Sequence, residues 1–194
     1  MRTWRRGSGL IVFRLSVPTR SSPAATMANC TSALFAHIAL VGNIRDISLA
    51  TLAKGDDTME WNEPVAEREV VDAIAKQADA SRVVYGCDLV CRTPGAPNVT
   101  ITHGMTLWIE FADLGRPDEE APLELRIALD VDMYCETTWG TDRDNRLVAE
   151  LNAPLFNEFL HQVSKACEAT VESVDAEDYV GQVGARGFIV SGSR

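Results

Sequence analysis

Polar side chains that alternate along residues 108–136 are the part of the sequence best suited to bind another molecule. If residues 98–111 and 123–136 are strands joined by a hairpin, their even-numbered side chains point to one face of the sheet. The residues that would share this face are Trp108, Glu110, Arg126, Asp130, Asp132, Tyr134 and Glu136. An indole ring among carboxylates can bind a cationic ligand or a basic peptide. The simpler alternative is a solvated face on which Glu110 and Arg126 form a cross-strand ion pair.

Asp130 and Asp132 are the residues most suited to hold a divalent cation. Two carboxylates two residues apart on a strand point the same way, with their α-carbons about 6.5–7 Å apart. No glycine-rich phosphate-binding loop accompanies them, and the three histidines are scattered. The sequence therefore predicts neither a metal nor a cofactor.

His103 is a polar residue on an otherwise apolar strand face and is followed by Gly104, which can mark a bulge. It is the one candidate for a general base, in a pocket between the sheet and the helices. The alternative, which the pattern favours, is a core histidine with one satisfied hydrogen bond. No nucleophile motif such as Gly-x-Ser-x-Gly is present, so the sequence favours a non-catalytic protein over an enzyme.

The elements that position these residues follow from the hydrophobic pattern. Alternation of apolar and polar residues predicts strands over 82–92, 98–111 and 123–136. The last of these is the clearest, because its odd-numbered residues are apolar and most of its even-numbered residues are polar. This is the pattern of an antiparallel strand with one buried face and one solvent-exposed face.

The flanking segments predict helices and a further strand. Helices are expected over 62–79 and 147–168, and a strand over 170–174. Residues 34–41 fit a buried helix or a buried strand, and residues 44–52 fit a short helix.

Taken together, the predicted order is helix, three-stranded meander, helix and strand. It indicates an α+β fold, an antiparallel meander of three or more strands covered on one face by helices. This order resembles the acidic chaperones of bacterial secretion systems, whose folds wrap unfolded effector segments. It is also similar to the core of double-stranded RNA-binding domains, against which the acidic charge argues. Both resemblances concern topology alone, over roughly residues 62–190.

The charge of the chain is unevenly distributed. The formal net charge is −10, and residues 1–26 hold five arginines and no acidic residue, which leaves 13 basic and 28 acidic residues in 27–194, a net charge of −15. Such a body repels phosphate backbones, so the sequence predicts a basic protein or peptide as partner and no double-stranded nucleic acid. No apolar run approaches the length of a membrane-spanning helix, and a homo-oligomer is compatible with the sequence.

Residues 1–26 have three interpretations. Met27 is the true start, or the segment is an arginine- and serine-rich transit peptide, or Arg5-Arg6 belongs to a twin-arginine export signal. Under each interpretation the segment is a leader outside the fold, and residues 27–194 form a single α+β domain.

The cysteines indicate in which cellular compartment the protein resides. The five cysteines are odd in number and spread out: Cys30, Cys87, Cys91, Cys135 and Cys167. Reduced, buried thiols are expected, which favours the cytoplasm, or an organelle matrix if residues 1–26 are a transit peptide.

We therefore expect a soluble, acidic, non-catalytic protein-binding module of the immunity, antitoxin or secretion-chaperone type, which contacts its partner through the acidic sheet face. The alternative is a small-molecule-binding protein or enzyme with a pocket between sheet and helices and His103 as general base.

Overall fold

The structure is a computed structural model that describes residues 4–19, 22–51, 58–62, 65–111, 122–138 and 144–191. In chain order its elements are β1 (Arg6–Val17), α1 (Pro23–His37), the 3-10 helix η1 (Ile38–Leu40), β2 (Gly42–Thr51), β3 (Thr58–Asn62), α2 (Glu67–Lys76), β4 (Ala80–Cys91), β5 (Val99–Phe111), β6 (Leu123–Val131), α3 (Arg146–Ala166), β7 (Thr170–Asp175), the 3-10 helix η2 (Glu177–Tyr179), β8 (Val183–Gly184) and β9 (Gly187–Phe188).

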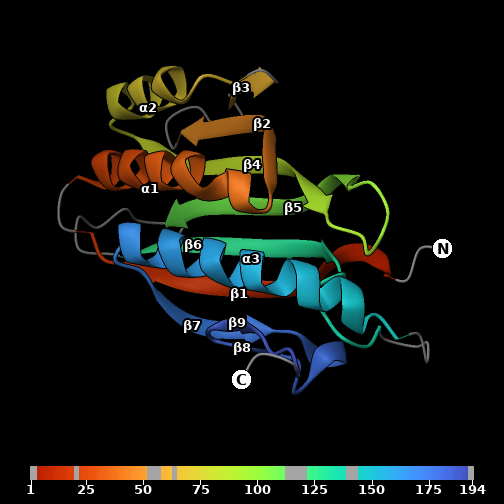
Figure 1. Cartoon of the computed structure of the whole chain (residues 1–194). Coiled ribbons are helices and arrows are strands. Elements are labelled where there is room, and N and C mark those ends of the chain that lie inside the picture. Colours follow the sequence, from red (N-terminus) through yellow and green to blue (C-terminus); the bar gives the residue numbers. More distant parts are fainter. Residues whose placement is uncertain are drawn as a thin grey trace.

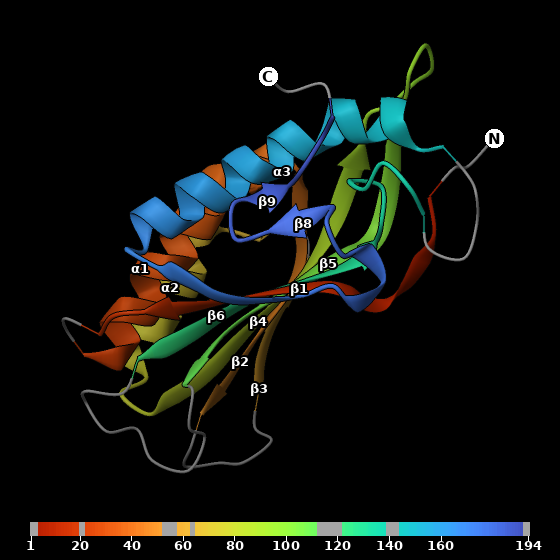
Figure 2. The ribbon, with the colours of Figure 1, turned by 90° about the horizontal axis from the view of Figure 1, so that it is seen from below.

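Antiparallel pairing organises these strands into one main sheet (Figure 1). In the described part of the chain, seven strands pair in the order β3-β2-β4-β5-β6-β1-β7, and β8 and β9 form a separate hairpin. Figure 2 shows α1, α2 and α3 on the same side of the curved sheet. The predicted α+β fold with an antiparallel sheet is confirmed, and so is the pairing of residues 98–111 with the strand that begins at Leu123.

The core forms where the odd-numbered side chains of the central strands meet the helices. Burying these side chains removes apolar surface from water, which is the main force that stabilises the fold. An aromatic cluster fills one end of the core: the Phe13 ring lies 5.4 Å from the Phe156 ring, and the Phe188 ring stacks on Tyr134 at 5.0 Å. These rings connect β1, α3 and β9 to the segment that follows β6.

Residues 6–17 form β1, between β6 and β7, so the prediction that residues 1–26 lie outside the fold is wrong. The fully buried side chains of this strand are Ile11, Phe13, Leu15 and Val17. Burial alternates along residues 11–17. Arg14 points to the other face, where its Nη1 donates to Glu124 Oε1 at 2.9 Å. Helix α1 then begins at Pro23, capped by the side chain of Ser22.

Residues 44–51 belong to β2 and do not form the predicted helix, and residue 52 lies outside the described residues. A shift in the pairing of β2 with β4 lies between Ile44 and Asp46. The extra residue of this bulge lets Ile44 and Ile47 both face the core although they are three apart, a spacing that resembles a helix. Strand β6 ends at Val131, five residues earlier than predicted.

Candidate functional site

The structure brings three of the seven predicted face residues together. Trp108 and Arg126 are paired across β5 and β6, and the Arg126 guanidinium lies 4.4 Å from the centre of the indole ring. Arg126 Nη2 also lies 2.9 Å from Glu110 Oε1. The chain's own arginine therefore covers the ring and neutralises the carboxylate that the prediction assigned to a basic partner.

Asp130 and Asp132 hold the N-terminal segment of the chain. Asp130 Oδ1 accepts the backbone N–H of Gly9 at 2.6 Å. Asp132 is fully buried and accepts the backbone N–H of Arg5 at 2.5 Å and the hydroxyl of Tyr179 at 3.0 Å. Burial raises the pKa of Asp132 above its ordinary value, although both hydrogen bonds act in the opposite direction. A buried carboxylate cannot belong to a solvent-exposed face, so the prediction for Asp132 is wrong.

Tyr134 and Glu136 also have internal roles. The Tyr134 ring is buried between Phe156 and Phe188, and its hydroxyl has no hydrogen-bond partner among the described residues. Its predicted place on an exposed face is therefore wrong. Glu136 accepts the backbone N–H and the hydroxyl of Ser191 at 2.5 and 2.6 Å, and these two bonds lower the pKa of Glu136. Both residues follow the end of β6, where the alternation of the strand no longer sets their direction.

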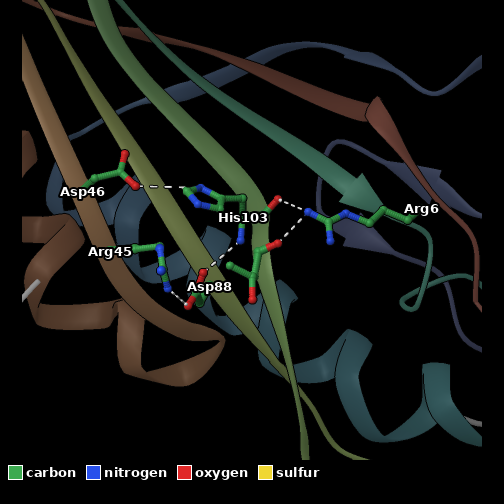
Figure 3. A network of polar contacts seen from close by, with 6 residues as sticks. Arg6, Arg45, Asp46, Asp88 and His103 are labelled. Atoms are coloured by element: carbon green, nitrogen blue, oxygen red, sulfur yellow. Dashed lines mark hydrogen bonds and ion pairs between the residues drawn. The ribbon is translucent and has the colours of Figure 1, made fainter. Parts of the chain in front are cut away.

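His103 is exposed and does not lie in the core (Figure 3), so the core-histidine prediction is wrong. Its side chain is 53% exposed, its φ is 47°, and its Nδ1 lies 3.7 Å from Asp46 Oδ2. The cause is the bulge that Gly104 predicted, which the shift in β4–β5 pairing confirms. A Cβ at Gly104 would lie 2.9 Å from Leu89 Cδ1, so glycine allows β5 to approach β4 there.

A polar network around His103 holds this bulge (Figure 3). Asp88 accepts the backbone N–H of His103 at 2.8 Å and the Arg45 guanidinium at 3.0 Å. Arg6 Nη2 donates to the carbonyl of Thr102 at 2.6 Å. The network thus connects β1, β2, β4 and β5 at the surface of the sheet. His103 does not lie in the predicted pocket between sheet and helices.

An apolar groove lies between the β4–β5 connection and the start of α3. It has a volume of about 750 Å³. The residues that line it are Trp4, Thr93, Pro94, Ala96, Pro97, Asn98, Val99, Asp144, Asn145, Leu147 and Val148. Leu147 is 64% exposed and Val99 is 40% exposed, and Leu151 follows one turn along α3 with 41% exposure. Sequence reasoning missed this groove, because residues 93–97 only connect two predicted strands and Leu147 only begins a predicted helix.

Two buried asparagines hold the walls of this groove in place. Asn152 of α3 accepts the N–H of Arg92 at 2.8 Å and donates to its carbonyl at 2.9 Å, which fixes the β4–β5 connection to the helix. Asn145, at the N-terminus of α3, donates to the carbonyls of Met133 and Cys135 at 3.2 and 2.9 Å. The groove is therefore formed before any ligand arrives.

Comparison of the chain with known protein families, with curated proteins and with solved structures gives no match. No helix among the described residues is both long and apolar enough to cross a lipid bilayer. The function is therefore inferred from the geometry of the chain itself.

Proposed function

We propose that this protein is a non-catalytic binding module that takes an apolar segment of a partner protein into the groove beside α3. The observation that carries the proposal is the preformed apolar groove of about 750 Å³ with two aliphatic side chains, Leu147 and Val99, exposed at its wall. Exposed apolar surface rimmed by polar residues is typical of sites where another protein binds. Burying such side chains against a partner supplies most of the binding free energy.

Charge favours an apolar or basic occupant over an anionic one. Asp144 lines the groove, and its Oδ1 already accepts the N–H of Arg146 in the first turn of α3 at 2.9 Å. An anion would therefore meet a carboxylate at the helix N-terminus, where it would otherwise be attracted. The net charge of −10 acts in the same direction. We expect a partner segment with large apolar side chains flanked by lysine or arginine, and a groove for an unfolded segment fits a secretion-chaperone type of role.

A small-molecule ligand is the second candidate. The volume of the groove, about 750 Å³, lies within the range of about 300–1,000 Å³ typical of ligand pockets. This alternative does not use His103 as a general base, because His103 is not among the residues that line the groove.

Substitution at the groove wall tests the proposal. Leu147→Asp places a charge at the wall without disturbing the core, since the side chain is 64% exposed. Met59→Asp is the matched control, because Met59 is 44% exposed on the edge strand β3 and does not line the groove. We expect Leu147→Asp to reduce binding of the native partner at least about tenfold, with an unchanged Tm, and Met59→Asp to leave binding intact.

The partner is identified by a photoreactive benzophenone side chain placed at position 147 or at position 59 in the native host. A protein crosslinked from position 147 and not from position 59 supports the proposal. Equal crosslinking from both positions, or undiminished capture by Leu147→Asp, would refute it. A bound small molecule in the native mass spectrum that Leu147→Asp removes would establish the second candidate instead.

A further inference from the structure

Two thiols that are far apart in the sequence meet in the core. Cys30 lies on α1 and is 1% exposed, and Cys167 follows the last residue of α3 and is 7% exposed. Both residues line one small cavity, and each thiol is the leading influence on the pKa of the other. The described contacts of Cys87, Cys91 and Cys135 include no second thiol, although all three are buried. Cys30 and Cys167 therefore differ from the other three cysteines in their contact with a second thiol and not in their burial.

A small cavity at the surface is lined by both cysteines. Its volume is about 100 Å³, and its lining includes Cys30, Cys167 and Thr26 together with Pro18 of the β1–α1 connection. Hydrogen peroxide has two heavy atoms and is small enough for a cavity of this size, whereas a tripeptide disulfide such as oxidised glutathione is far larger than the cavity.

We propose that Cys30 and Cys167 are a peroxide-reactive dithiol, which hydrogen peroxide entering this cavity converts to an intramolecular disulfide between α1 and the end of α3. The Cys167 thiolate attacks one peroxide oxygen, the O–O bond breaks, and hydroxide leaves, which yields a sulfenic acid on Cys167. The Cys30 thiol then attacks the Cys167 sulfur, the S–O bond breaks, and water leaves. In total two thiols lose two electrons and two protons, and one peroxide is reduced to two water molecules.

The interaction between the two thiols indicates the order of attack. It lowers the pKa of the Cys167 thiol, whereas together with burial it raises the pKa of Cys30. The thiolate is the reactive form of cysteine, so Cys167 is the attacking residue and Cys30 is the resolving residue. Cys167 is also the more exposed of the two.

The disulfide would close a loop of about 137 residues, which restricts the unfolded chain much more than the folded one. We expect the oxidised protein to melt roughly 10 °C above the reduced protein.

The test treats the full-length native protein with hydrogen peroxide or, separately, with oxidised glutathione, then blocks free thiols under denaturing conditions and maps the peptides. We expect peroxide to remove about 2 Da and to yield one linked peptide that contains Cys30 and Cys167, with the other three cysteines blocked as free thiols. Oxidised glutathione should form this link at least about tenfold more slowly, because it cannot enter the cavity. Equal rates with the two oxidants, a link between other cysteines, or retention of all five free thiols would overturn the proposal.

Three variants test the order of attack. In Cys30→Ala, peroxide should leave Cys167 as a sulfenic acid that dimedone traps, whereas in Cys167→Ala the remaining Cys30 should stay unmodified. Cys135→Ala is the matched control, since Cys135 is buried without a partner thiol among its described contacts and its loss should leave the Cys30–Cys167 link intact. Trapping of Cys30 in place of Cys167 would contradict the assignment. The wild-type peptide map decides the proposal even if a variant fails to fold.

Discussion

Deleting residues 1–26, so that the chain begins at Met27, should abolish the native fold. The deletion removes β1 from between β6 and β7, which leaves β7 without its only described strand partner and exposes the edge of β6. A leader sequence would have no such effect, since its removal leaves the folded domain unchanged.

The magnitude follows from the side chains that β1 buries. Ile11, Phe13, Leu15 and Val17 are all fully buried, and burial of each contributes about 1.5–3 kcal/mol. Together they contribute about 6–12 kcal/mol, which is comparable with the whole free energy of unfolding of a typical domain, about 5–15 kcal/mol. After the deletion, β6 keeps β5 as its one described neighbour. No other described strand then lies beside the edge of β6 that β1 covered.

A point substitution gives the same information without deleting the strand. Phe13→Ala should lower the free energy of unfolding by about 3–5 kcal/mol, because it leaves a cavity beside Phe156 and Phe188. For a chain of this size the Tm falls by roughly 6–20 °C. Val12→Ala is the control, because the neighbouring side chain is half-buried on the other face of the sheet and should cost much less.

Circular dichroism with thermal and urea unfolding measures both effects. A chain beginning at Met27 that purifies with the same far-ultraviolet spectrum and the same Tm as the full chain would refute the placement of β1. Equal losses for Phe13→Ala and Val12→Ala would show that the two faces of β1 are not distinguished as the structure has them.

Two further predictions concern the polar groups that follow β6. Tyr134→Phe should raise the free energy of unfolding by about 1–3 kcal/mol, measured by urea titration, because it removes a buried hydroxyl that has no partner among the described residues; a loss of stability would show that the hydroxyl is bonded. For Asp132, a raised pKa means that the folded state destabilises the ionised form, so its contribution to stability falls as the pH rises above about 3.9 towards the folded pKa. The Tm of Asp132→Asn relative to wild type should therefore increase between pH 4 and pH 7, and a constant difference across this range would contradict the shift.

The elements that could be predicted from the sequence are those whose pattern is set locally. Strands β4, β5 and β6 alternate between apolar and polar residues, and α3 has an apolar stripe with helical spacing, so each was found to within a few residues except at the end of β6. Strand β1 was missed because the contact that explains Arg14, its ion pair with Glu124, joins residues 110 positions apart. Without that partner, an arginine in an apolar run indicates a targeting segment more strongly than a strand.

The predicted placement of Asp132 and Tyr134 on an exposed face was wrong for the same physical reason. The alternation of polarity continues to Glu136, but the strand ends at Val131, and the acidic residues near that point are held by groups distant in sequence. Asp132 accepts the N–H of Arg5, 127 positions earlier, and the hydroxyl of Tyr179, 47 positions later. Residue type correctly indicated that these carboxylates need hydrogen-bond donors or cations, but only the fold shows that the chain supplies the donors itself.

The N-terminal segment therefore determines which polar groups are bonded within the chain and which surface can bind a partner. The backbone N–H groups of Arg5 and Gly9 donate hydrogen bonds to the carboxylates of Asp132 and Asp130. Trp4, just before them in the sequence, lines the groove. A chain lacking this segment would release two carboxylates and lose one wall of the groove. If the acidic face were the binding surface, a folded fragment without residues 1–9 would bind a basic partner more strongly than the full chain does. If the groove is the binding surface, that fragment binds the partner more weakly, because the aromatic ring of Trp4 no longer contributes to the contact.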